Sequence, residues 1–224
     1  MGTRCKVFIS YSHKDEVRGG SQVEPGLGYP KVFYSRFQAA IAAHKDLLAS
    51  EEIFFDDARL GTEPVWRRAI ETALDECWLL IFLVSPDSIL SNFCMTKEIP
   101  RALLRGARVM TVVLRPSPDW HGVKVSDPTS GRALGELGEF HAGGLPKVGA
   151  NTKAICDWAS EDDAWAKTCE GILAFLKGAD FRPPADVQHD PVHVDTANAR
   201  SHEASPEPRP EWPQEEAAFL NDCS

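Results

Sequence analysis

"WLLIFLVS", residues 78–85, is the most apolar stretch of the chain, and it decides the fold. A strand in a parallel sheet is covered on both faces, so its sequence is apolar throughout instead of alternating. "ARVMTVVL", residues 107–114, has the same character. "CKVFISYS" at 5–12 and "EIFFDD" at 52–57 are also strand-like. These four stretches predict a parallel sheet.

The segments between these strands repeat their apolar residues at the spacing of a helix. Strands that alternate with such helices form a doubly wound α/β sheet, with helices on both faces. The expected helical faces are formed by Phe33, Phe37, Ile41 and Leu48 in 31–50, by Trp66, Ala69, Ile70, Ala73 and Leu74 in 61–77, and by Trp165, Cys169, Ile172 and Leu176 in 160–178.

The composition of the chain changes near residue 178. From there to residue 224 it has seven prolines, and ten acidic residues against three basic ones. Such a segment cannot bury enough apolar surface to offset the entropy that it would lose on ordering. We therefore expect one folded domain over residues 1–177 and a disordered, acidic, proline-rich tail or linker over residues 178–224.

Charge and cysteine content exclude several classes of protein. The net charge is −9, whereas nucleic-acid binding requires a basic surface. The six cysteines show no C-x-x-C pair and no regular spacing, so neither a disulfide framework nor a zinc site is expected. The longest apolar run, residues 77–84, is too short to span a membrane, and no export signal is recognisable. We expect a cytoplasmic protein with no metal, nucleic-acid or membrane partner.

Ligands of doubly wound sheets bind beyond the carboxyl ends of the strands. In this chain those ends are followed by residues 10–15, 56–61 and 85–98. The third segment contains "SNFCMTKEIP", residues 91–100, whose one acidic residue is Glu98. Glu98 is therefore the first candidate for a functional side chain.

Three common readings of such a sheet fit the sequence poorly. "GGSQVEPGLG" at 19–28 lacks the G-x-G-x-x-G pattern of dinucleotide-binding proteins, and "GLPKVGAN" at 144–151 lacks the Lys-Ser/Thr of a P-loop. We interpret both as loops. A phospho-receiver domain would need an acidic pair after the first strand, where the chain has Ser10-Tyr11-Ser12-His13, and a lysine after a late strand, where it has Leu114-Arg115-Pro116.

Three motifs in a fixed order resemble a bacterial TIR (Toll/interleukin-1 receptor) domain. They are "VFISYSHKDE", "FFDDARLGTEPVWRRAIETAL" and "LLIFLVSPDSILSNFCMTKEIPRAL". The later "LPKVGANTKAICDW" and "DDAWAKTCEGILAFL" are similar to the closing part of such domains. The resemblance covers residues 4–177 and implies a flavodoxin-like TIR fold. It also implies that residues 57–64 form the BB loop, an assembly surface containing Leu60 and Gly61, through which TIR domains form homo-oligomers or filaments.

The resembled family contains interaction adaptors and enzymes that cleave NAD+ at the nicotinamide–ribose bond. The enzymes need a glutamate in the helix after the third strand, and Glu98 matches that position. A tryptophan four residues before the glutamate is common in the family, whereas this chain has Cys94 there. Phe93, five residues before, is the candidate for that aromatic role.

A single carboxylate suits NAD+ cleavage on chemical grounds. Nicotinamide leaves as a neutral base, so no general acid is needed, unlike in most glycoside hydrolases. A fixed anion can stabilise the ribosyl cation that develops. NAD+ would be the substrate, and no cofactor is expected.

Further substrate contacts are expected from Ser12, His13, Asp57 and Trp66. Each has an ordinary structural alternative: a turn residue for Ser12, a surface residue for His13, an ordering role in the BB loop for Asp57, and core packing for Trp66. Glu98 itself has the alternative of a solvated acid that stabilises a helix N-terminus.

The resemblance, together with the chemistry of Glu98, therefore predicts an NAD+ glycohydrolase that is activated by TIR self-association and acts as an effector of prokaryotic antiviral defence. The alternative is a non-catalytic TIR adaptor that acts by protein interaction in signal transduction. Sequence does not separate a linear from a cyclic ADP-ribose product.

Overall fold

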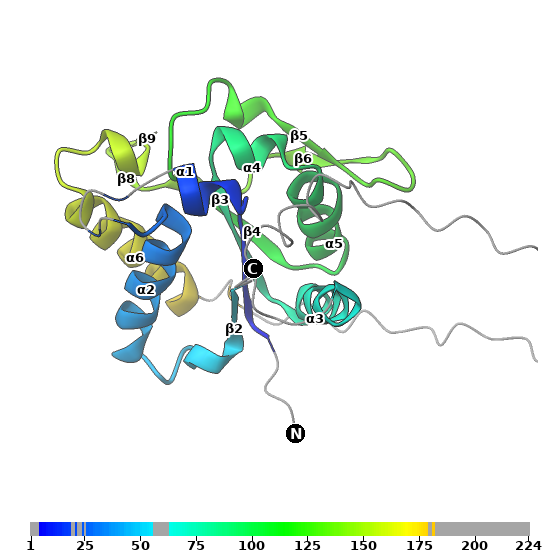
Figure 1. Cartoon of the computed structure of the whole chain (residues 1–224), viewed down its shortest axis with the longest axis horizontal. Helices are drawn as coiled ribbons and strands as arrows, with labels where there is room; N and C mark the ends of the chain where they lie inside the picture. The colour runs from blue at the N-terminus through cyan, green and yellow to red at the C-terminus, as the bar shows by residue number, and fades with distance from the viewer. Residues whose placement is uncertain are drawn as a thin grey trace, which may run out of the picture. The chain divides into compact units, whose positions relative to one another are not determined.

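The computed structural model describes residues 5–18, 26–55 and 63–178, together with Ser21, Glu24 and Phe181 (Figure 1). The predicted disorder of the tail concerns residues that lie outside this part of the chain, apart from Gly178 and Phe181. The predicted BB loop also lies outside it, except for the backbone of its last two residues.

Five parallel strands form the central sheet in the order β2-β1-β3-β4-β7. Their bounds are Ile53–Phe55 for β2, Val7–Ser10 for β1, Leu79–Val84 for β3, Arg108–Val113 for β4 and His141–Leu145 for β7. This is the flavodoxin-like order, 2-1-3-4-5 when only these strands are counted. The predicted doubly wound α/β fold is confirmed.

Helices cover both faces of the sheet (Figure 1). α2 (Tyr29–Ala42) and α6 (Glu161–Lys177) pack on one face, and α3 (Glu63–Glu76) and α5 (Ile99–Leu104) on the other. Successive residues of β3 enter opposite layers of the core, which explains why that strand is apolar throughout. Leu79, Ile81 and Leu83 join the layer under α2 and α6, while Leu80, Phe82 and Val84 join the layer under α3 and α5.

The crossover from β4 to β7 contains a β-hairpin where doubly wound folds usually have a helix. A short η3 turn (Trp120–Gly122) leads to the antiparallel pair β5 (Lys124–Ser126) and β6 (Ala133–Glu136). Val125 of β5 is fully buried in the α3–α5 layer, together with Trp120 and Leu137. The hairpin therefore covers part of the sheet.

The prediction that residues 144–151 form a loop is wrong in part. Gly144 and Leu145 complete β7, and β8 (Lys147–Val148) pairs with β9 (Asn151–Thr152). Gly144 has a φ of +95°, and a Cβ there would come within 2.8 Å of the Trp120 ring. A glycine is required at this point of the strand, and its weak strand propensity hid the strand from sequence analysis.

Short elements lie around the sheet strands. They are α1 (Lys14–Arg18) after β1, η1 (Ser50–Glu52) before β2, α4 (Pro86–Leu90) and the η2 turn (Cys94–Glu98) after β3, and η4 (Ile155–Asp157) before α6. None of the helices in the described ranges is long and apolar enough to cross a membrane.

Candidate active site

Glu98 lies where the carboxyl end of β1 meets the helical segment that follows β3. Ser10, the last residue of β1, donates a hydrogen bond from Oγ to Glu98 Oε2 at 2.6 Å. Ser10 is 1% exposed and Glu98 is 5% exposed. The carboxyl group is therefore at the edge of the sheet where ligands of this fold class bind, as predicted, but it is buried in the single chain.

Glu98 ends a π-turn, Cys94–Glu98, in which the N–H of Ile99 donates to the carbonyl of Cys94 five positions earlier. Pro100 gives the reason for this geometry. A proline inside a helix cannot donate a hydrogen bond, and its ring would clash with the carbonyl four residues before it. Widening the preceding turn by one residue relieves that clash. Turns of this kind are frequent at functional sites.

The extra residue in the π-turn changes which side chain shares a helix face with Glu98. In a regular α-helix, Cys94 would lie one turn before Glu98; the wider π-turn brings Phe93, five residues before Glu98, closer to that position. The Phe93 ring stacks on Trp66 of α3, with ring centroids 5.7 Å apart. Cys94 is buried like Glu98, and its Sγ donates to the carbonyl of Tyr11 at 3.4 Å. This register supports the interpretation that Phe93 supplies the aromatic group.

Ser12 and His13 lie between β1 and α1, directly before the first residue of α1. The carbonyl of Ser12 accepts from the N–H of Asp15 at 2.9 Å, and its Oγ accepts from the N–H of Lys14 at 3.4 Å. His13 Nδ1 lies 3.5 Å from Glu16 Oε1. Both predicted substrate contacts thus have structural roles at the start of a helix, close in sequence to the Glu98 partner.

Glu16 is the residue of α1 whose charged contacts hold this helix in place. Tyr11 donates from its hydroxyl to Glu16 Oε1 at 2.7 Å, and Lys31 Nζ lies 2.8 Å from Glu16 Oε2. Burial by itself would raise the pKa of Glu16, but hydrogen bonds from His13, Lys31 and Tyr11 outweigh it and lower the pKa to about 2. Glu16 therefore holds α1 against α2 as a carboxylate.

A buried charge network ties together the loops after β1, β3 and β4. Arg115 Nη2 donates to Asp15 Oδ1 and to Asp87 Oδ2, each at 2.5 Å. Ser85, the N-cap of α4, donates from Oγ to Asp15 Oδ2 at 2.6 Å. Asp15 is fully buried, and this burial raises its pKa although the hydrogen bonds from Ser85 and Arg115 lower it. The network fixes the loops around the carboxyl edge of the sheet.

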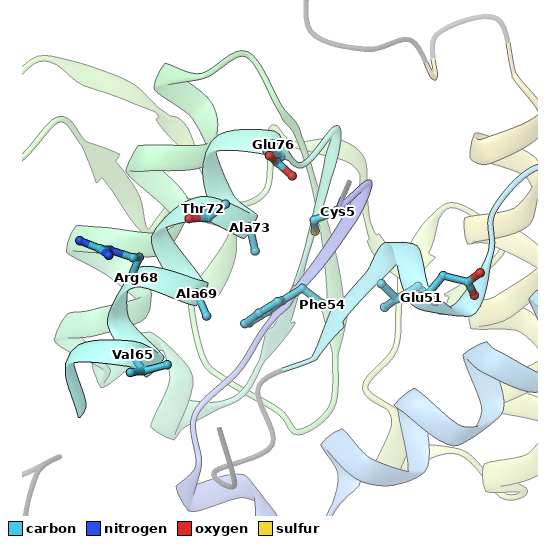
Figure 2. A pocket seen from close by; sticks show the side chains of 10 residues that line it. Cys5, Glu51, Phe54, Val65, Arg68, Ala69, Thr72, Ala73 and Glu76 are labelled. Atoms are coloured by element: carbon cyan, nitrogen blue, oxygen red, sulfur yellow. The ribbon is translucent and has the colours of Figure 1, made fainter. Parts of the chain in front are cut away.

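A pocket of about 420 Å³ lies elsewhere, between α3 and the edge strand β2 (Figure 2). Phe54 and Ala69 form part of its apolar wall, and Glu51, Glu76 and Arg68 surround it (Figure 2). Neither Glu98 nor Ser10 lines this pocket. The candidate site is therefore defined by side-chain geometry at the sheet edge.

The structure brings some of the predicted site residues together. Trp66 and Phe93 stack on each other, and Phe93 belongs to the same helical segment as Glu98. Trp66 is half-buried and also packs on the core, so both of its predicted roles stay open. Asp57, Leu60 and Gly61 lie outside the described residues. Among the residues that the structure describes, no group of three or more His, Cys, Asp or Glu side chains could hold a metal ion.

Sequence analysis missed the two most direct partners at this edge. Ser10 stands 88 positions from Glu98, and Arg115 stands 100 positions from Asp15. The one available signal was their position at the carboxyl ends of β1 and β4, because strand ends of a parallel sheet meet at one edge.

No protein-family model matches this chain. An uncharacterized protein of Sinorhizobium fredii, y4lF, is 26% identical to it over 169 residues, which is 74% of this chain and 42% of that protein. The chain thus spans less than half the length of this relative.

Proposed function

We propose that residues 1–177 form a TIR domain that cleaves NAD+ to nicotinamide and ADP-ribose in the cytoplasm, as an effector of prokaryotic defence. The buried hydrogen bond between Ser10 and Glu98 at the carboxyl edge of the sheet carries this proposal. Support also comes from the order of the three TIR-like motifs, and from the flavodoxin-like strand order.

The reaction needs little more than a fixed negative charge. The bond between ribose C1′ and the nicotinamide nitrogen breaks, and its electron pair stays on nicotinamide, which leaves as a neutral base. The positive charge then moves onto the ribosyl group, where the Glu98 carboxylate stabilises it. Water adds at C1′ and releases a proton; attack by an internal nucleophile would give a cyclic product. A charge held in place before the reaction is the most effective form of such stabilisation.

Self-association is part of the proposal because Glu98 is 5% exposed in the single chain. A buried carboxylate can act on a substrate only after a rearrangement around it. We propose that contact between TIR domains through the BB loop, including Leu60 and Gly61, provides this rearrangement. Substrate contacts are assigned to Ser12, His13, Asp57, Trp66 and Phe93.

The decisive test is nicotinamide release by wild type and by Glu98→Gln, measured by chromatography at high protein concentration. Removing the charge should slow release by on the order of a hundredfold or more, the scale for losing one preorganised electrostatic partner. Glu170→Gln is the matched control, because Glu170 is an exposed acid of α6 that pairs only with Lys167 in the described contacts. Equal activity of wild type and Glu98→Gln would refute the assignment.

A non-catalytic interaction domain is the second candidate, and the burial of Glu98 favours it. In that case the protein would self-associate in light scattering, while concentrated wild type released no nicotinamide above a blank. Substitution of Leu60 by glutamate would then change the assembly state alone.

A further inference from the structure

We infer that Ser10 is a positioning residue for Glu98, which fixes the catalytic carboxyl group in place. This inference rests on the proposed function. It starts from the 2.6 Å hydrogen bond between Ser10 Oγ and Glu98 Oε2, two atoms in side chains that are almost completely buried.

The position of Ser10 within β1 makes its hydroxyl group unusual. Side chains two apart in a strand point to the same face, so Ser10 shares a face with Phe8. Phe8 belongs to the apolar layer with Cys94 and Ile99. An apolar residue would fit that face, and a buried hydroxyl costs free energy unless it is hydrogen-bonded. The hydrogen bond to Glu98 therefore explains why a hydroxyl group is tolerated at this buried position.

The hydrogen bond also has a defined direction. An ionised carboxylate only accepts, so Ser10 must donate to it. Hydrogen bonds from a hydroxyl to a carboxylate are shorter than neutral ones, at about 2.5–2.7 Å, and the observed 2.6 Å agrees with that class. Ser10 thus fixes the orientation of the Glu98 carboxyl group.

The donor itself stands on a rigid support. β1 pairs with β2 on one side and with β3 on the other, and Ser10 is in register with Phe82 of β3. The next residue of the chain, Tyr11, accepts a hydrogen bond from Cys94 through its carbonyl. Two consecutive residues at the end of β1 are therefore linked to the two ends of the π-turn. These links set the rotation of the turn about its axis.

A kinetic double-mutant cycle tests this inference, with wild type, Ser10→Ala, Glu98→Gln and the double variant. Ser10→Ala should lower kcat for nicotinamide release about tenfold or more, with KM changed less than threefold, because the carboxylate then loses its orientation. In the Glu98→Gln background the same substitution should change kcat less than twofold. An equal loss in both backgrounds would mean that Ser10 serves the fold and would overturn the inference.

Thr168→Val is the matched control. Thr168 is fully buried in α6, and its hydroxyl donates to the carbonyl of Ala164 at 2.8 Å. The control thus removes a buried hydroxyl far along the chain from Glu98, and it should keep kcat within twofold of wild type. A loss equal to that of Ser10→Ala would also overturn the inference.

A second cycle separates this inference from the proposed function. It measures urea unfolding of wild type, Ser10→Ala, Glu98→Ala and the double variant. Each variant multiplies the unfolding equilibrium constant by some factor. The factor for the double variant should be at least about fivefold smaller than the product of the two single-variant factors, a typical coupling for a buried hydrogen bond to a carboxylate. Additive changes would show that Ser10 does not hold Glu98. An inert wild type with clear coupling would refute the proposed enzyme, and with it the catalytic part of the inference.

Discussion

Replacing Arg115 by methionine should destabilise the fold strongly, because it leaves Asp15 buried without its charged partner. Arg115 Nη2 donates to Asp15 and to Asp87 at 2.5 Å, and Asp15 is 0% exposed. Removing one partner of a buried ion pair costs about 3–5 kcal/mol. In a domain of this size that corresponds to a fall in Tm of roughly 6–20 °C.

The size of this loss should depend on pH. Burial raises the pKa of Asp15 above its ordinary value of 3.8, so the native state takes up a proton at a higher pH than the unfolded state. Without Arg115 that pKa rises further. At a pH below the pKa of Asp15 in the unfolded chain, Asp15 is protonated in both the folded and the unfolded state, so no uncompensated charge is buried. As the pH rises, Asp15 ionises and the loss of unfolding free energy in the variant grows, until it is complete above the pKa of Asp15 in the folded state. The penalty of Arg115→Met should be smallest in acid.

Urea unfolding followed by circular dichroism measures these differences. The matched control is Arg101→Met, which removes a pair with Asp75 of similar length, at 2.7 Å, whose side chains are about one-third exposed. That loss should stay within about 1 kcal/mol. Adding Asp15→Asn to Arg115→Met should restore part of the stability. If Arg115→Met lost no more than Arg101→Met, the assignment of a buried network would be wrong.

Four further predictions concern the stability and the activity of the protein. Glu16→Gln should lower the free energy of unfolding by roughly 2–3 kcal/mol at pH 7, and urea titrations should show this difference vanishing as pH falls from 4.5 to about 2, the pKa of Glu16. Phe93→Ala should reduce nicotinamide release more than Cys94→Ala; the reverse order would contradict the π-turn register. Gly28→Ala should lower Tm by several degrees, because its Cβ would meet the backbone of α1 at 2.4 Å. Activity should rise more than linearly with protein concentration, and Leu60→Glu should flatten that rise in the same assay.

Sequence was sufficient for the parallel sheet because β3 and β4 carry the information in their own composition. An apolar run such as Leu79–Val84 needs cover on both faces, and helices α2, α3 and α6 show their apolar faces at regular spacing. These properties are local, so they can be read from the sequence. The strand β7 was missed because Gly144 suits a close approach to Trp120, which is a contact set by tertiary structure.

The candidate site was predicted only in outline. The topology rule placed Glu98 at the correct edge, but the partners of its carboxylate depend on which strand ends are neighbours in space. Ser10 became visible only through the pairing of β1 with β3. The π-turn depends on a competition between Pro100 and the regular helix, which is decided by packing and not by the propensity of any one residue.

Because of the π-turn, the position of the Glu98 carboxyl group depends on the number of residues in this segment as well as on their identity. Loss of a single codon within Cys94–Glu98 would restore an ordinary helical repeat, but it would bring the ring of Pro100 back against the preceding turn. Such a deletion should be tolerated only alongside a change of that proline. If the proposed TIR resemblance is right, an alignment with TIR sequences needs a one-residue gap in the middle of this helix, so that Phe93 and not Cys94 pairs with the aromatic position.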